Sequence, residues 1–228
     1  MPRDAADTRA ALLEAGRHLF ATEGVHSVPL VSIIKAAGQY NSSVVHYHFA
    51  TDGLDARTGL LMTIIAMEDA SVEVERQLMM DIIRKQGRLN DIPALVRAVI
   101  IPMVPKFRDT AGLEYLAIIS QMLEIFNTWD AGGPRMPSSA FEVFDAIQKA
   151  LPNNLPSKVR RERVVRFLVM SVEAVGSHAR YLSSLETQPE SPNRLETRAF
   201  VENLIDMGVG ALTAPRLSEL SERDLDLL

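Results

Sequence analysis

The chain has 228 residues, of which 47% are hydrophobic and 23% are charged, and its formal net charge is −5 at pH 7, values that exclude a disordered chain. It contains no cysteine, which excludes disulfides, thiolate catalysis and cysteine-based zinc sites and fits a reducing cytoplasm. We find no signal peptide and no run near the roughly 18 apolar residues that span a bilayer, so we expect a cytoplasmic protein without membrane attachment.

Three helices are predicted in the first fifty residues, over residues 5–23, 29–37 and 42–48. Apolar residues recur at spacings of three and four in the first helix, and Gly24 ends it. Pro29 suits the first turn of the second helix, which ends at Gly38. Asn41 or Ser42 is expected to open the third helix as its cap. This order of helix, turn and short helix is typical of a helix-turn-helix, which places one helix in the major groove of DNA.

The remainder of the chain also has helical periodicity. A long helix is predicted from near Thr51 or Asp52 to Met80, although Gly59 inside it weakens the pattern. Five more helical segments are expected, over residues 91–106, 110–128, 138–151, 157–185 and 194–213. Pro102 should kink or end the first of these. No segment alternates like a strand.

We therefore expect an all-α fold with about nine helices. Three regions are predicted: a helix-turn-helix DNA-binding domain over residues 1–50, a helical ligand-binding and dimerisation domain over residues 51–213, and an acidic C-terminal tail over residues 214–228.

Residues 8–54 contain the most specific pattern in the chain. Its characteristic residues are Ala15, Leu19, Phe20, Gly24, Ile33, Ala37, Gly38, Tyr47, His48, Phe49 and Leu54. With these residues the segment resembles the DNA-binding head of the tetracycline-repressor (TetR) family of transcriptional regulators. The resemblance covers about a fifth of the chain, while the rest is similar only in length, helix count and polarity. It implies a homodimer, a repressor in most members, that a small apolar or amphipathic molecule releases from a palindromic operator in double-stranded DNA.

The resemblance also implies a set of DNA-binding residues. They are Arg3, Lys35, Asn41, Ser42, Ser43, Val44, His46, Tyr47 and His48. Residues 42–44 would face base edges, and residues 46–48 would hold phosphates or brace the helix. Arg3 would reach a phosphate or the minor groove, and Lys35 would add a backbone contact. For Tyr47, a place in the core and a phosphate contact are equally open.

Several residues depart from the family pattern in ways that remove donors or positive charge. Pro29 stands where the family often has Ser or Thr, Val31 where it often has Arg, and Asp52 where it often has Lys or Arg. His46 stands where Tyr is common. Residues 1–60 hold five Lys and Arg against six Asp and Glu, so the head is close to neutral. Non-specific attraction to phosphates should therefore be weak.

A candidate effector site lies in the body, where flexible and aromatic side chains gather between residues 110 and 145. The predicted ligand-binding residues are Tyr115, Met122, Phe126, Trp129, Phe144 and His178. Such side chains can line an adaptable apolar pocket, but each of them is also a normal core residue. His178 in particular can be a satisfied core or interface histidine instead of a ligand contact.

Two apolar stripes on the last two long helices predict a dimer interface. The first comprises Val164, Phe167, Leu168, Ser171 and Val175, and the second comprises Phe200, Leu204, Met207, Gly208 and Ala211. Two chains would close a four-helix bundle around a twofold axis.

The sequence leaves two alternatives to a DNA-binding regulator. A helical small-molecule-binding protein with weakened or lost DNA binding is the alternative that the neutral head favours. An enzyme is disfavoured, because the sequence has no phosphate-binding loop and no His/Asp/Glu cluster with metal-ligand spacing. We accordingly expect no catalytic residues, no metal site and no cofactor.

Overall fold

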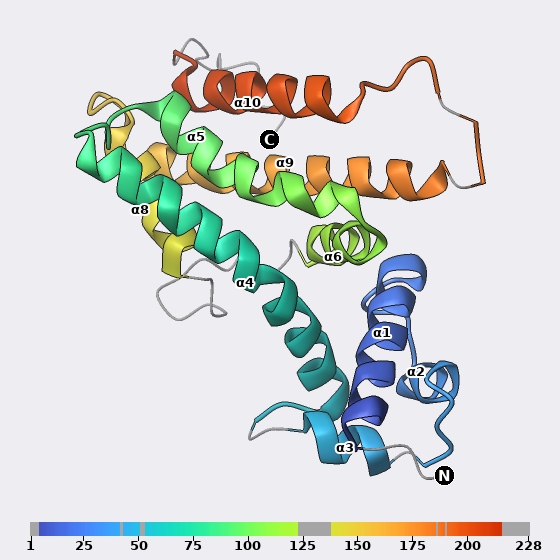
Figure 1. Ribbon diagram of the computed structural model, residues 1–228. Coiled ribbons are helices and arrows are strands. Elements are labelled where there is room, and N and C mark those ends of the chain that lie inside the picture. Colours follow the sequence, from blue (N-terminus) through green and yellow to red (C-terminus); the bar gives the residue numbers. More distant parts are fainter. Residues whose placement is uncertain are drawn as a thin grey trace, which may run out of the picture.

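The computed structural model describes residues 5–41, 43–50, 53–122, 138–185, 187–189 and 191–215. Within these residues the chain forms nine α-helices and one 3-10 helix, which confirms the predicted all-α fold (Figure 1). Almost all of the predicted acidic tail, like the segment between residues 123 and 137, lies outside the described residues.

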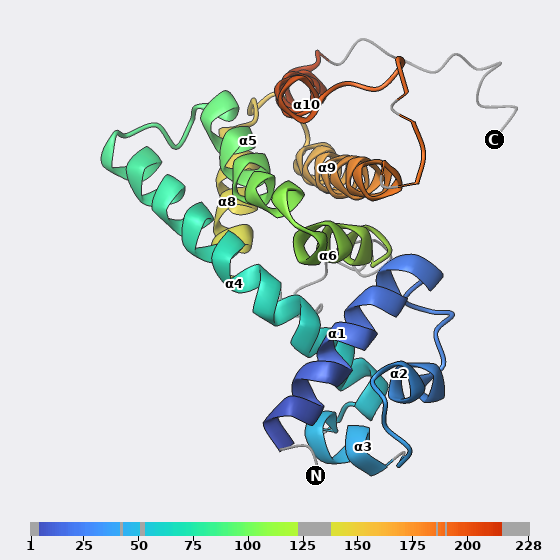
Figure 2. The same ribbon diagram turned by 45° about the vertical axis from the view of Figure 1, so that its right-hand side comes forward.

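The first three helices form a small head at one end of the molecule (Figures 1 and 2). They are α1 (Ala5–Glu23), α2 (Leu30–Ala36) and α3 (Ser43–Phe49), close to the predicted ranges. Fully buried side chains join the three helices, because Leu12, Phe20, Ile33 and Val45 each have 0% exposure. The apolar periodicity that predicted the helices is thus the periodicity of the head core.

Helix α4 (Ala56–Lys85) is 30 residues long and runs from the head into the body (Figure 1). The predicted start near Thr51 or Asp52 was wrong. The cap is Asp55, whose carboxylate accepts hydrogen bonds from the backbone N–H of Arg57 (3.0 Å) and of Thr58 (3.1 Å). The predicted end at Met80 was five residues too early, because the helix continues to Lys85 and the chain then turns at Gly87, where φ is +65°.

The body continues with α5 (Ile92–Ile100), the 3-10 helix η1 (Ile101–Arg108) and α6 (Thr110–Ser120). The predicted break at Pro102 is confirmed, since the α-helix changes to a 3-10 helix at Ile101 and a second proline, Pro105, lies inside η1. Asp109 caps α6 by accepting a hydrogen bond from Gly112 N–H at 2.8 Å.

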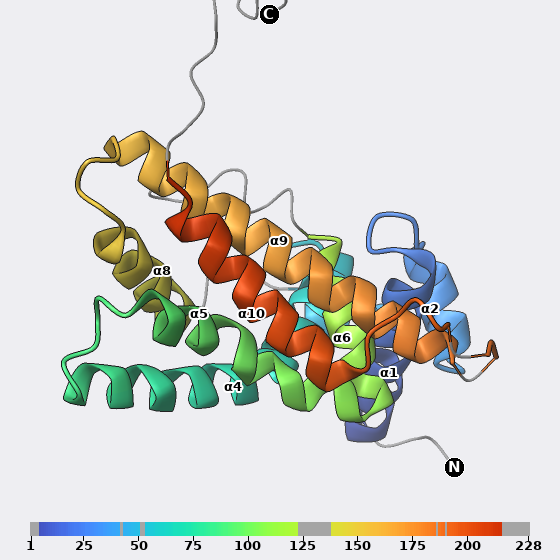
Figure 3. The ribbon, with the colours of Figure 1, turned by 90° about the horizontal axis from the view of Figure 1, so that it is seen from above.

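Three further helices complete the body, α8 (Ser138–Ala150), α9 (Ser157–Ser184) and α10 (Thr197–Thr213). Helix α6 lies between α9 and α1, and so connects the body to the head (Figure 2). Helices α6 and α9 cross closely, because a β-carbon at Gly176 would lie 2.2 Å from Ser120 Cβ. Viewed from above, α4 forms one edge of the body, and α5, α9 and α10 all lie to the same side of it (Figure 3).

Candidate nucleic-acid interface

The turn between α2 and α3 sets the direction of α3. Gly38 has φ +68°, a conformation that favours glycine, and Gln39 N–H donates to the Ile34 carbonyl at 2.9 Å. Asn41 then opens α3, because its Oδ1 accepts a hydrogen bond from Ser43 N–H at 2.9 Å. Of the two predicted caps, Asn41 is therefore the one that the structure shows capping the helix, and Ser42 lies outside the described residues.

Helix α3 has one buried face and one exposed face. Val45 and Phe49 are buried in the head core, whereas Ser43, His46 and Tyr47 are exposed. These three follow the spacing of one helical face, so their side chains point to the same side. Two other predicted contacts are intermediate: Val44 is half-buried against the core, and His48 is half-buried with its ring edge-to-face on Tyr47, 5.0 Å between centroids.

The exposure of Tyr47 decides a point that the sequence left open. Its side chain is 82% exposed, so it is not a core residue. Phe49, two residues further on, holds the other side of the helix, with the Arg9 guanidinium 5.4 Å from its ring centroid. The packing of the buried face of α3 in the head core therefore fixes the direction in which its exposed face points.

Two exposed residues of the head were missed as contact candidates. Tyr40, in the turn before α3, is fully exposed at 102%, and Val31 on α2 is 68% exposed. Tyr40 lies in a turn, where helical periodicity cannot predict which way a side chain points. The only sign in the sequence that it is exposed was its position beside the Asn41 cap. Val31 was noted only as a departure from the family pattern.

Most positive charge in the described head is already used within the chain. Arg17 pairs with Glu114, and the Arg57 guanidinium donates to the carbonyl oxygens of Val25 and Val28. Arg9 lies over the Phe49 ring. Among the described Lys and Arg residues of α1 to α3, Lys35 is exposed and has no intrachain partner. Arg3 lies outside the described residues.

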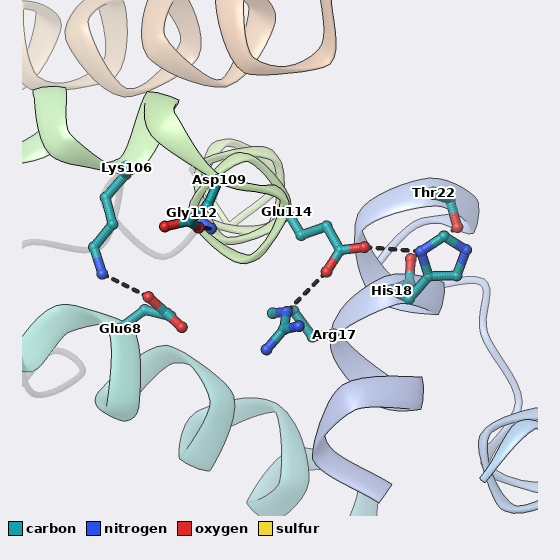
Figure 4. Close-up of polar contacts among 8 residues, drawn as sticks. All are labelled: Arg17, His18, Thr22, Glu68, Lys106, Asp109, Gly112 and Glu114. Carbon is teal, nitrogen blue, oxygen red and sulfur yellow. Dashed lines mark hydrogen bonds and ion pairs between the residues drawn. The ribbon is translucent and has the colours of Figure 1, made fainter. Parts of the chain in front are cut away.

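Head and body are joined by polar contacts from α6 (Figure 4). The buried carboxylate of Glu114 accepts a hydrogen bond from Arg17 Nε at 2.8 Å and lies 2.8 Å from His18 Nδ1, so two residues of α1 converge on it. At the C-cap of α6, Gln121 Oε1 accepts a hydrogen bond from Val25 N–H, in the turn after α1, at 2.9 Å. The end of α1 is therefore held by α6 at two points.

The described candidate effector residues occupy separate places. Tyr115 is 2% exposed and donates to Asp69 on α4, and Met122 is half-buried at the end of α6. Phe144 lines a hollow of about 300 Å³ between α8 and α9, without Tyr115 or His178. Phe126 and Trp129 lie outside the described residues, so the predicted effector site stays a prediction.

His178 occupies an aromatic cluster between α9, α10 and η1. Its ring stacks on Phe200 with 4.1 Å between centroids and 4° between planes, and Phe107 meets it edge-on at 5.2 Å. Its Nε2 lies 3.1 Å from Thr197 Oγ1. Burial in this apolar setting lowers the pKa of His178 to about 4, with a further contribution from the charge of Arg194. The sequence left two roles for His178, a hydrogen-bonded core or interface histidine and a ligand contact. The burial and the hydrogen bond favour the core histidine.

A second buried polar group joins α4 to α6 and α8. The Tyr115 hydroxyl bonds Asp69, and the Glu73 carboxylate accepts hydrogen bonds from Ser139 N–H (2.7 Å) and Oγ (2.6 Å). Burial raises the pKa of Asp69 and raises that of Tyr115 well above its usual value. Burial also lowers the pKa of Arg76, which lies close to this group.

For most of the residues predicted at a dimer interface, burial inside the single chain corrects the prediction. Seven of them are buried inside the single chain: Val164, Phe167, Leu168, Ser171, Val175, Leu204 and Gly208. The stripes of α9 and α10 pack on each other and on α5 and α6, so they form intrachain core. Gly208 serves this packing, because a β-carbon there would lie 2.6 Å from Phe167 Cε2. A buried side chain does not face a partner, so these seven are not available as an interface.

The other three predicted dimer residues lie on a neighbouring face. Met207 is 50% exposed, Ala211 is exposed and Phe200 is half-buried. On α9, the small or apolar residues Met170, Ala174 and Ser177 are also half-buried, and their spacing of four and three residues places them on one side of that helix. Together these six residues are called the outer face of α9 and α10.

No helix in the described part of the chain is long and apolar enough to cross a membrane. The described residues likewise contain no group of three or more His, Asp or Glu side chains arranged to hold a metal ion.

No protein-family model and no curated protein matches the sequence. Among solved structures, the chain is similar to a protein from Rhodococcus sp. that is assigned to the TetR family of transcriptional regulators. The two chains are 14% identical, and the similarity covers 91% of this chain and 100% of that chain with a TM-score of 0.45.

Proposed function

We propose that the protein is a DNA-binding transcriptional regulator and that α3 is the helix that enters the major groove. The observation that carries the proposal is the geometry of α3. Its inner face is fixed in the head core, while Ser43, His46 and Tyr47 project together from the exposed side. The TetR-like pattern of residues 8–54 supports the same conclusion.

The proposed contacts follow from this geometry. Ser43, at the start of α3, is suited to a base edge, and His46 and Tyr47 are suited to phosphates. Lys35 and Tyr40 extend the surface on the α2 side. Because Lys35 is the one unpaired cation that we find in the described helices of the head, each head should bind weakly by itself. Two heads linked in a dimer would bind a palindrome as a connected pair.

We place the dimer contact on the outer face of α9 and α10. Small and apolar side chains there permit close helix approach, and the face lies beside the intrachain core that the two helices already share. An isologous contact of this kind would produce the four-helix bundle expected from the sequence.

We propose that a small apolar or amphipathic effector acts on DNA binding through α6 and α4. Helix α6 holds α1 through Glu114 and Gln121, and it holds α4 through the Tyr115–Asp69 hydrogen bond. A ligand that displaced α6 would therefore act on both helices that position the head. If the ligand bound more tightly to the arrangement with α6 displaced than to the arrangement with α6 in place, it would release the protein from the operator.

The test is DNA binding by fluorescence anisotropy, with the DNA upstream of the protein's own gene at low salt. We expect Tyr47→Ala to weaken binding roughly tenfold, and Lys35→Ala to weaken it uniformly while reducing the salt slope by about one. Leu89→Ala, in the turn after α4, is the control and should bind as the parent does. If the parent protein shows no sequence-dependent binding to this DNA or to a random library, the proposal is wrong.

A helical ligand-binding protein without operator recognition remains the second candidate, and the small number of unpaired cations in the head favours it. It differs from a regulator in one measurable respect. It would bind a small molecule and select no sequence from a random duplex library, whereas a regulator would enrich a palindrome.

A further inference from the structure

Helices α8 and α9 form the walls of a hollow that the proposed function does not use. Its volume is about 300 Å³. The apolar residues that line it are Phe141, Phe144, Val164 and Val165. Among the described residues that line it, the only carboxylate is Asp145, which is already paired with Lys149 at 2.6 Å. The hollow lies where α9 begins, at the end of the body away from the head (Figures 1 and 3).

Basic side chains lead from the end of α10 to this hollow. Arg163 Nη1 donates to the carbonyl oxygen of Leu212, one residue before the end of α10, at 2.9 Å, and Arg161 lines the hollow. Arg160 lies between these two, because at 100° per residue it is 60° from Arg163 and 100° from Arg161 around the axis of α9. We call these three residues the basic row of α9. The chain that continues from α10 therefore begins beside a row of guanidinium groups that ends at the hollow.

The positive charge at the start of α9 exceeds the negative charge around it. Residues 158–166 hold five Lys and Arg against one acid, Glu162, which pairs with Arg166 at 2.6 Å. In the described part of the chain Arg160 has no carboxylate partner. Its Nη1 donates to the side-chain oxygen of Asn153 at 3.4 Å, and its Nε is buried without a hydrogen bond. A buried donor without an acceptor costs stability, so this end of α9 is suited to an acidic partner.

The chain that follows α10 is acidic and rich in leucine. Residues 217–228, which lie outside the described residues, hold four Asp and Glu, one Arg and five Leu. We call them the acidic segment. Leu220 is eight residues beyond Leu212, a length that spans up to about 28 Å when extended. A helix with its side chains is about 10–12 Å across. Leu217 and Leu220 are therefore close enough along the chain to reach the hollow on the other side of α9.

We propose that the acidic segment binds back onto the start of α9 in its own chain, with Leu217 and Leu220 in the hollow and its carboxylates on the basic row. An apolar hollow beside a basic row is complementary to a segment that combines leucine with acids. Because the segment is tethered a few residues from the hollow, its effective concentration there is in the millimolar range, which favours it over acidic partners in solution. The bound segment covers the hollow and keeps other polyanions from the basic row.

Cysteine cross-linking tests the position of the acidic segment without background, because the chain contains no cysteine. In glutathione buffer, we expect Gln148→Cys/Leu220→Cys to form an intramolecular disulfide with an effective thiol concentration roughly tenfold above that of Leu185→Cys/Leu220→Cys. Gln148 lines the hollow, whereas Leu185 is about 33 Å from Arg163 along α9. Changing the four acids of the segment to amides should lower the value for the first pair roughly tenfold. Equal values for the two pairs, or no effect of the amides, overturns the proposal.

Random-sequence duplex DNA at low salt tests nucleic acid as the alternative partner of the basic row. We expect the parent protein and Arg160→Gln/Arg161→Gln to bind this DNA equally, because the acidic segment already covers the row. The amide variant of the segment should bind it roughly tenfold more tightly. Arg160→Gln/Arg161→Gln should remove that gain, whereas Arg198→Gln at the exposed start of α10 should not. Tighter binding by the parent than by Arg160→Gln/Arg161→Gln would make DNA the partner and overturn the proposal. A gain that is absent, or that survives Arg160→Gln/Arg161→Gln, would overturn it as well.

Discussion

Gly59 on α4 lies directly against the backbone of Phe49 at the end of α3. A β-carbon at Gly59 would be only 1.9 Å from the Phe49 carbonyl oxygen. The glycine that weakened the sequence prediction of a long helix is therefore the point at which the end of α3 rests on α4. The position of α3 relative to the body depends on this contact.

Gly59→Ala should accordingly displace the end of α3 and destabilise the head. We expect a loss of about 1–3 kcal/mol, the usual cost of overpacking, although alanine is the better helix former. Gly16→Ala, where α1 packs against α4, is a matched control. Its β-carbon would meet the flexible Leu60 Cδ2 at 3.1 Å, so its cost should be smaller. Thermal unfolding of both variants measures the difference, and equal stability would contradict the proposed close contact.

The Glu114–Arg17 pair is expected to contribute to stability because it is largely removed from water. The side chains are 10% and 24% exposed. We expect Glu114→Gln and Arg17→Met each to cost about 1–3 kcal/mol, and the double variant to cost clearly less than their sum. The exposed pair Arg198–Glu202 provides the control cycle, with an expected coupling below about 0.5 kcal/mol. A coupling no larger at Glu114 than at Glu202 would remove this pair as a link between head and body.

His178 should make stability depend on pH in a defined window. Its pKa is lowered from 6.5 to about 4 in the folded chain, so the unfolded chain binds more protons between these values. Its contribution is therefore present in full above pH 6.5 and is lost progressively as the pH falls toward 4. We expect His178→Phe to flatten the pH dependence of the unfolding temperature in this window. The exposed His26→Gln should leave the profile unchanged, and a profile equally steep in both variants would contradict the assignment.

Met207 tests the outer face of α9 and α10 as the dimer contact. We expect Met207→Lys to convert the dimer to a monomer in sedimentation experiments and to weaken operator binding at least tenfold, because the two heads are no longer linked. Thr213→Lys adds the same charge at an exposed position near the end of the same helix and should remain dimeric. A dimer that survives Met207→Lys would place the contact elsewhere.

The sequence by itself determined the helices and most of their ends. The range of α1 was predicted to the residue, and the break at Pro102 was predicted correctly, because periodicity, glycine and proline act within a few residues of themselves. The exposed side of α3 was predictable only in part, since Val45 and Phe49 follow the spacing of one helical face, whereas Val44 is apolar as well and the place of Tyr47 stayed open. Among the errors, the start of α4 was misplaced because several neighbouring residues were possible caps, and only the folded chain shows that Asp55 is the one used.

Only the tertiary structure decided which surfaces face one another. Helices α9 and α10 each have two adjacent apolar sides, and periodicity does not tell which of them is buried inside the chain. Glu114 and Arg17 are separated by 97 positions, so their pairing depends on how α6 lies across α1. The exposure of Tyr40 has the same origin. Local residues determine a helix, but the partner of each helical face is determined by packing between segments that are distant in the chain.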